Sequence, residues 1–120
     1  MRTKDAVGRY GEDLAADYLR QQGMAILDRN WRCPSGELDI IAREQRTVVI
    51  VEVKTRSTTA FGDPAEAITP AKAHRIHRLA LAWAEETRAS GTWLELRFDV
   101  IAIIRLAAGG PSIRHLRGAF

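Results

Sequence analysis

A run of ten residues, TVVIVEVKTR at positions 47–56, constrains the fold of this chain more than any other stretch. Its four consecutive apolar residues, Val48 to Val51, predict a strand that is buried on both faces, in the middle of a sheet. Side chains alternate along a strand, so Glu52 and Lys54 at its end point to one face, roughly 6–7 Å apart along the backbone. An acid and an amine at the end of a buried strand require a partner, a metal ion or a substrate.

The composition is that of a globular chain, with 46% hydrophobic and 28% charged residues. A length of 120 residues suits one core, so we expect a single domain over residues 1–120. The lone Cys33 excludes an internal disulfide and indicates a cytoplasmic protein, and no apolar run predicts a membrane span or signal peptide. The net charge of +3 permits nucleic-acid binding without establishing it.

Hydrophobic periodicity predicts helices over residues 5–22 and 70–89, the second with Thr69 as its N-cap and Pro70 at its first position. Besides the central strand, further strands are predicted over residues 24–32, 37–43, 94–104 and 112–117. Residues 57–69 form a polar connection in which Asp63 could cap one helical turn. The order α-β-β-β-α-β-(β) predicts an α/β sandwich, a mixed sheet flanked by helices.

The connection before the central strand determines which side chains meet. A two-residue loop at Gln45-Arg46 places Asp39 opposite Glu52 and Glu37 opposite Lys54, and a four-residue loop keeps the same register. Neither loop residue favours a positive φ, so the four-residue loop is at least as well supported. Directly opposed Cβ atoms lie about 4.5–5.5 Å apart, where two carboxylates repel each other unless a cation or a proton joins them.

Asp39, Glu52 and Lys54 on one surface are the groups that phosphodiester hydrolysis requires. Carboxylate oxygens bind Mg²⁺ or Mn²⁺, and such an ion polarises a phosphoryl oxygen and lowers the pKa of a bound water. The lysine would orient that water or neutralise developing charge. Glu12 could complete the coordination shell from the first helix, and Glu37 is a candidate supporting group. The sequence contains neither a zinc-ligand pattern nor a glycine-rich phosphate-binding loop, so it gives no indication of another cofactor.

Each of these residues also has a structural interpretation. Glu52 and Lys54 could form a solvated pair, Asp39 could be satisfied by Arg56 or by a backbone amide, and Glu12 could pair with a neighbouring arginine. The residues alone leave both interpretations open.

Two further charged residues lie beside apolar positions. Lys72, on the apolar side of the second helix, either snorkels to solvent or reaches the carboxylates. Asp99 precedes a buried run, and we expect a structural partner such as Arg97 or Arg56.

Five motifs in order carry a family resemblance: GxxGEDLAAxYL at 8–19, GELDIIA at 36–42, VEVKTR at 51–56, the Pro70-Ala71-Lys72 helix start and RFDVIAI at 97–103. They resemble the YraN family of small bacterial proteins, catalogued as uncharacterised, over nearly the whole chain. That family is similar to archaeal-type Holliday junction resolvases of the PD-(D/E)xK restriction-endonuclease-like superfamily.

The resemblance implies a restriction-endonuclease-like sandwich that acts on nucleic acid with Mg²⁺ or Mn²⁺. Asp39 matches the aspartate of the superfamily motif, and Glu52-Val53-Lys54 matches its acid-x-lysine. Glu12 matches the helix glutamate of resolvase-like members, and Lys72 matches a lysine typical of YraN-like sequences. Leu38 stands where the motif has proline, a departure that is common in the superfamily and removes no ligand.

Two hypotheses on function follow. In the first, the protein is a Mg²⁺-dependent endonuclease for DNA, with a preference for branched or irregular DNA. Asp39 and Glu52 hold the metal, Glu12 assists, Lys54 acts on water and phosphate, and a homodimer is expected by analogy with two-fold resolvases. In the second, it is a nucleic-acid-binding or protein-interaction module on a nuclease-like scaffold, without turnover.

Overall fold

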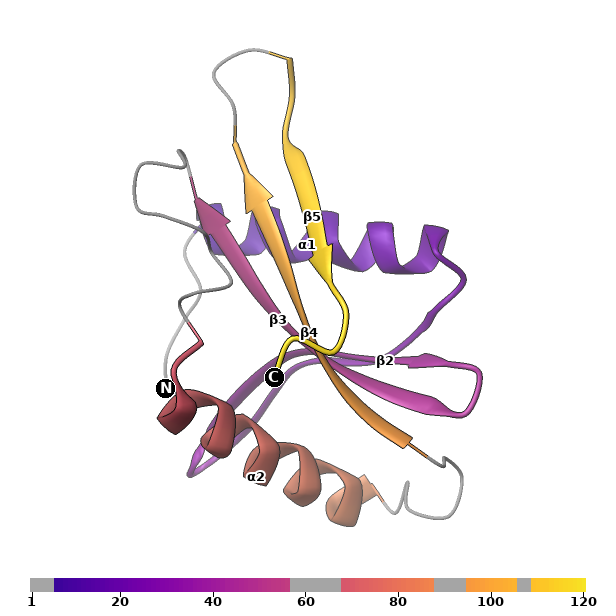
Figure 1. Ribbon diagram of the computed structural model, residues 1–120, viewed down its shortest axis with the longest axis vertical. Coiled ribbons are helices and arrows are strands. Elements are labelled where there is room, and N and C mark those ends of the chain that lie inside the picture. The colour runs from indigo at the N-terminus through magenta and orange to yellow at the C-terminus, as the bar shows by residue number, and fades with distance from the viewer. Residues whose placement is uncertain (1–5, 57–67, 88–94, 106–108) are drawn as a thin grey trace.

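Five strands in one sheet and two helices make up the part of the chain that the structure describes (Figure 1). This computed structural model describes residues 6–56, 68–87, 95–105 and 109–120. In chain order the elements are α1 (Ala6–Gln21), β1 (Ala25–Cys33), β2 (Gly36–Glu44), β3 (Thr47–Arg56), α2 (Pro70–Thr87), β4 (Glu95–Ile104) and β5 (Ser112–Leu116). The predicted α/β order is confirmed, including the last strand, whereas the cap predicted at Asp63 lies outside the described residues.

The strands lie across the sheet in the order in which they occur in the chain. β3 and β4 are parallel, and the other neighbouring pairs are antiparallel. A parallel pair needs a crossover connection, and α2 belongs to the connection between β3 and β4. Neither of the described helices combines the length and the apolar character needed to span a bilayer.

The two helices cover opposite faces of the sheet, α1 behind it and α2 in front of it (Figure 1). The central strand β3 serves both layers, since Val49 and Val51 pack on the α1 side while Val48 and Ile50 pack on the α2 side. Burial of such side chains contributes about 1.5–3 kcal/mol each. This double burial explains the uninterrupted apolar run that the sequence shows at these positions.

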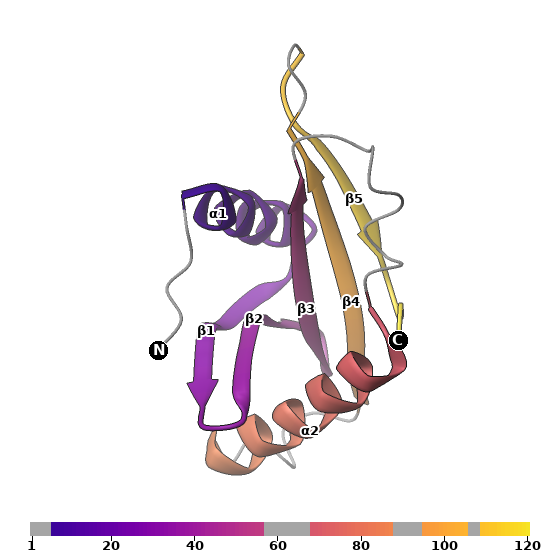
Figure 2. The ribbon, with the colours of Figure 1, turned by 90° about the vertical axis from the view of Figure 1, so that its left-hand side faces the viewer.

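β2 separates from β3 partway along its length. The ladder between them ends at the Ile40–Val51 pair. Ile40 packs on the α1 side, but Leu38, two residues earlier, packs on the α2 side. Residues two apart share a face in a regular strand, so β2 is bent at Asp39. Figure 2 shows the outer half of the β1–β2 hairpin lying toward α2 and away from β3.

β1 carries two irregularities near the same bend. Its register with β2 shifts between Ile26 and Asp28, and Asn30, which the register places opposite Asp39, has a positive φ of 54°. An extra residue in one strand bends and twists a β ladder, and asparagine is among the few residues that adopt the left-handed region readily. These irregularities bend the hairpin and open a space between β2 and β3.

The loop between β2 and β3 is the two-residue turn Gln45-Arg46, in which Gln45 adopts a positive φ of 55°. The predicted register is confirmed for every pair of this ladder, but the ladder ends just before the predicted pair of Asp39 and Glu52, which is therefore not a strand pair. The predicted pairing of Glu37 with Lys54 is wrong, because β2 has left β3 before that position; Glu37 is instead opposite Arg32 of β1.

Candidate functional site

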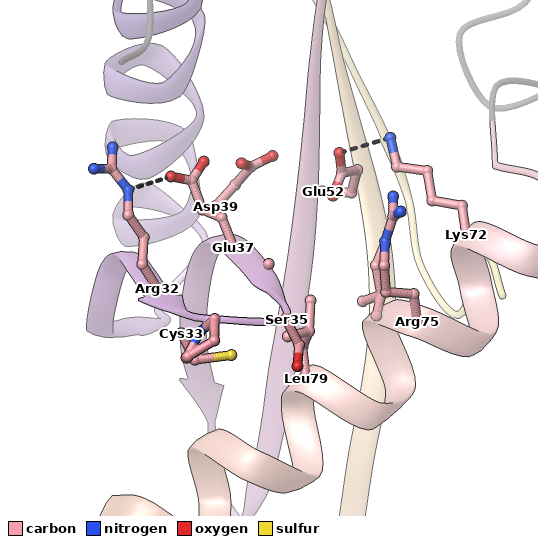
Figure 3. A pocket seen from close by; sticks show the side chains of 12 residues that line it. Arg32, Cys33, Ser35, Glu37, Asp39, Glu52, Lys72, Arg75 and Leu79 are labelled. Carbon is pink, nitrogen blue, oxygen red and sulfur yellow. Dashed lines mark hydrogen bonds and ion pairs between the residues drawn. The ribbon is translucent and has the colours of Figure 1, made fainter. Parts of the chain in front are cut away.

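A pocket of about 710 Å³ lies where β2 and β3 separate (Figure 3). Its walls are the β1–β2 turn, the first residues of β2, the later part of β3 and the first turns of α2. Its charged lining residues are Arg32, Glu37, Asp39, Glu52, Lys72 and Arg75. Figure 3 shows the carboxylates of Asp39 and Glu52 directed from neighbouring strands into the same space. The structure therefore brings these two predicted site residues together.

Asp39 is held by the backbone of β3. Its side chain is almost fully buried, and Oδ2 accepts a hydrogen bond of 2.9 Å from the N–H of Val53. This N–H would be a ladder donor if β2 had stayed beside β3, so the carboxylate replaces the lost strand partner. The predicted backbone-amide partner of Asp39 is thus present. A carboxylate has about four lone-pair sites, so the bond does not prevent the residue from also binding a cation.

Glu52 lies between two amines. Its Oε1 is 3.2 Å from Nζ of Lys72 and 3.4 Å from Nζ of Lys54, and 13% of its side chain is exposed. Of the two interpretations of Lys72, the structure therefore supports the one in which it reaches the carboxylates. Lys54 contacts Glu52 but is not among the residues that line the pocket.

The electrostatics of the pocket oppose the charged forms of its central groups. Burial, and then the negative charge of Asp39, raise the pKa of Glu52, although Lys72 and Lys54 act in the opposite direction. Burial, and then the neighbouring Lys72, lower the pKa of Lys54. A further cation between Asp39 and Glu52 would relieve the repulsion that raises the pKa of Glu52.

Glu12 lies apart from this pair. It projects from α1 with 1% of its surface exposed, and its Oε1 accepts hydrogen bonds from Nε of Arg29 at 3.0 Å and Nδ2 of Asn30 at 2.9 Å. It does not line the pocket. Among the described residues, no three His, Cys, Asp or Glu side chains are close enough to hold one metal ion. The predicted partner arginine of Glu12 is present, and its predicted role as a ligand stays a prediction.

Two carboxylates are nevertheless a donor set that Mg²⁺ uses. This ion is commonly held by one or two carboxylates, while water and substrate phosphates fill the other positions. Asp39 and Glu52 offer hard oxygen ligands, and burial together with the charge of Asp39 raises the pKa of Glu52 even though two lysines lie beside it. These residues therefore fit a magnesium or manganese ion.

Glu37 lines the pocket and pairs with Arg32. Its Oε2 accepts a hydrogen bond of 2.6 Å from Nε of Arg32, the residue opposite it in β1. This ion pair joins the two strands of the bent hairpin. Its predicted supporting role at the site stays a prediction.

Sequence analysis missed two residues near this site. Arg75 lines the pocket from α2, and the available signal was its position three residues after Lys72, which places both on one helix face. Asn30 binds Glu12 and lies opposite Asp39 in the register. Its positive φ within a strand depends on the bend, and the local sequence gives no signal for it.

Asp99, the other buried acid of the sheet, belongs to a different cluster. Its oxygens accept hydrogen bonds from Nε and Nη2 of Arg97 at 2.9 and 3.0 Å, and one lies 2.7 Å from Nε2 of His115. The N–H of Gly118 donates a further bond of 3.0 Å. Burial opposes ionisation most strongly, but the bonds from His115, Arg97 and Gly118 together lower the pKa of Asp99 to about 2. The predicted structural partner Arg97 is confirmed.

Comparison with known proteins finds one uncharacterised family. The sequence model of the uncharacterised protein family UPF0102 matches residues 11–103. A UPF0102 protein of Beutenbergia cavernae is 51% identical over 118 residues, which are 98% of this chain and 98% of the relative. Those of Acidothermus cellulolyticus and Nocardia farcinica are each 50% identical, over 98% of this chain and 95% and 91% of the relatives. The matched range contains Asp39 and Glu52, the two carboxylates directed into the pocket.

Proposed function

This chain belongs to the UPF0102 family, and we propose that it is a metal-dependent endonuclease that hydrolyses phosphodiester bonds of DNA with Mg²⁺ or Mn²⁺. UPF0102 is the YraN family, so the predicted membership is confirmed. One observation carries the proposed activity. The carboxylates of Asp39 and Glu52 share a pocket of about 710 Å³ with Lys72, and Lys54 contacts Glu52 from the same strand.

Each residue has a chemical role in this proposal. Asp39 and Glu52 would hold the ion, which polarises a phosphoryl oxygen and lowers the pKa of its bound water. Lys54, whose pKa is lowered by burial, would orient that water and donate a hydrogen bond to a phosphoryl oxygen as charge develops. Lys72 would turn from Glu52 to the phosphate once a cation neutralises the carboxylate.

Glu12 has a supporting role in this proposal. Its carboxylate holds Arg29 and Asn30, and the register places Asn30 opposite Asp39. It thereby stabilises the bend that turns Asp39 toward Glu52. Direct coordination by Glu12 would require its carboxylate to release both of these partners.

The test is a cleavage assay with labelled duplex, four-way junction, flap and single-stranded DNA, and with RNA, in Mg²⁺ or Mn²⁺. We expect the wild type to cleave, and the cleavage rate to fall at least about a hundredfold in Glu52→Ala and in Asp39→Ala. The cleavage rate of Glu85→Ala should equal that of the wild type. Glu85 is an exposed acid of α2 outside the pocket, so its loss controls for charge alone. Equal behaviour of the wild type and Glu52→Ala would remove the catalytic role.

One observation favours a second function, a nucleic-acid-binding or protein-interaction module without turnover. Lys72 and Lys54 already neutralise Glu52, and no third acid joins the pair among the described residues. Such a module would bind nucleic acid in a salt-dependent way, without Mn²⁺, and would retain binding in Asp39→Ala and Glu52→Ala. Calorimetric titration with Mn²⁺ separates the two functions, because the nuclease should bind the ion tightly and the module should not.

Action on DNA in a bacterium would place the protein in the cytoplasm, and analogy with resolvases suggests a two-fold symmetric homodimer. Light scattering after size exclusion, with and without a four-way junction, would measure the oligomeric state.

A further inference from the structure

We infer that a groove leading out of the pocket along α2 binds the phosphodiester backbone of one nucleic-acid strand, through Arg75 and Arg78. The inference rests on the proposed function for the identity of the polyanion. It concerns residues that the proposed chemistry does not use.

The groove is formed by two adjoining cavities. A smaller cavity of about 240 Å³ lies beside the pocket, and both are lined by Cys33, Ser35, Arg75 and Leu79. Figure 3 shows Cys33 and Ser35 at the β1–β2 turn, facing α2, which carries Arg75 and Leu79. Because the two cavities share this wall, a ligand in the pocket can continue into the smaller cavity without leaving the protein surface.

The balance of charge shifts along the groove. The charged residues that line the pocket are three acids and three cations, whereas the residues that line the smaller cavity include Arg78, the shared Arg75 and no acid. The pocket therefore offers acids for a cation, and the smaller cavity favours an anion. A nucleic-acid strand with a metal ion at one phosphate and arginines at the next phosphates has this distribution.

The two arginines are available to a ligand. Both are exposed, and within the described residues neither forms an ion pair with a carboxylate. Arg32 on the facing wall, by contrast, is committed to Glu37 at 2.6 Å. An unpaired guanidinium beside a groove is suited to phosphate, because its planar donors bind two phosphate oxygens at once.

The spacing also suits a strand of phosphates. Arg75 and Arg78 are three positions apart in α2, a rise of about 4.5 Å on one helix face, so their long side chains can reach neighbouring phosphates of one strand. Leu79 and Ala82 give the smaller cavity an apolar part of its lining. A cavity of about 240 Å³ accepts one backbone and is far too small for a duplex.

Ala82 is the last residue of α2 that lines the smaller cavity. Glu86 follows Ala82 at helical spacing and accepts a hydrogen bond of 3.1 Å from Nε1 of Trp31. Its negative charge limits the basic stretch to the two arginines. The groove thus accounts for about two phosphates beyond the pocket.

The test measures binding without cleavage, by fluorescence anisotropy in EDTA over a series of salt concentrations. The probes are a labelled single-stranded DNA and the matching duplex, and the variants are Arg75→Gln, Arg78→Gln and the double variant. Arg46→Gln is the control, because it removes the same charge from the exposed β2–β3 turn. Unchanged thermal unfolding would verify that all variants fold.

We expect each groove variant to weaken binding about five- to tenfold at roughly 0.1 M salt and to lower the salt slope by about 0.7–0.9, while the control keeps the wild-type slope. An effect with the single strand alone identifies an unpaired strand as the ligand, and an effect with both probes identifies one strand of a duplex. Groove variants that match Arg46→Gln would overturn the inference.

The outcome is separable from that of the proposed activity. If the arginine variants lose binding but the wild type cleaves nothing in Mg²⁺, the groove stands and the nuclease fails. If the wild type cleaves and both arginine variants keep its KM, the nuclease stands and the groove fails.

Discussion

Lys72 binds the carboxylate that the proposed metal ion would use, and replacing it tests this competition. Its Nζ lies 3.2 Å from Oε1 of Glu52, with 24% and 13% of the two side chains exposed. Lys72→Met keeps a long apolar side chain and removes the ammonium. The change should therefore free Glu52 for a cation while leaving the packing of α2 largely intact.

The size of the effect follows from this contact. A hydrogen bond to a charged group contributes roughly 1.5–3 kcal/mol, and the ion must displace this one to bind Glu52. Without Lys72, Mn²⁺ should bind roughly ten- to a hundredfold more tightly, since about 1.4 kcal/mol is a factor of ten. Lys72 also lowers the pKa of Glu52, so the comparison belongs at a pH where the carboxylate is ionised in both proteins.

The assay is calorimetric titration with Mn²⁺ in the absence of nucleic acid. Arg75→Met is the matched control, because Arg75 is a cation of the same pocket and helix that makes no ion pair with Glu52 within the described residues. We expect the control to change affinity by less than about threefold, since an exposed charge is screened. If Lys72→Met folds normally and binds Mn²⁺ no more tightly than the wild type, the ion and the ammonium do not compete for Glu52.

Three further predictions concern stability. The pKa of Asp99 is about 2 in the folded protein, against an ordinary 3.8, so its ionised form should add about 2.5 kcal/mol to the free energy of unfolding above pH ~4. This stabilisation should be lost as the pH falls through about 2. Urea unfolding at several pH values should show this dependence in the wild type and not in Asp99→Asn; equal curves would contradict it. Gly11→Ala would make a Cβ overlap Oγ1 of Thr55 and lie 2.9 Å from its Cβ. The steric cost of about 1–3 kcal/mol should exceed the gain in helix propensity of about 1 kcal/mol, so the variant should be less stable and its Tm lower. A Tm no lower than that of the wild type would show that α1 shifts without cost. Gln45→Gly, at a φ of 55°, should stabilise the protein by about 0.5–1 kcal/mol in thermal unfolding, and a fall in Tm would reveal an unrecognised contact of the glutamine.

The sequence was most informative where local pattern and burial agree. The strand predicted over residues 47–56 has these bounds in the structure, because its apolar run is buried by α1 on one face and by α2 on the other. The predicted N-cap is also present, since Oγ1 of Thr69 accepts a hydrogen bond of 3.1 Å from the N–H of Lys72. Both features depend on neighbouring residues in the chain.

The shape of the pocket could not be predicted in this way. Alternation assigns Asp39 to a face of a regular strand, but it does not indicate that β2 leaves β3 after Ile40. That separation depends on the positive φ of Asn30 and on the packing of Leu38 against α2, a helix that follows later in the chain. Glu37 moved with the bent hairpin, and its predicted partner was lost for this reason.

Two acids of the sheet, Asp99 and Glu52, show why we place function at the pocket and not elsewhere. Asp99 is fully buried, yet hydrogen bonds from His115, Arg97 and Gly118 lower its pKa to about 2, so its charge is satisfied by the fold. Glu52 is more exposed and has two lysines beside it, yet burial and Asp39 still raise its pKa. An acid whose ionisation the fold opposes, in a pocket that solvent can enter, is a candidate functional site, and a cation bound beside it would favour the ionised form.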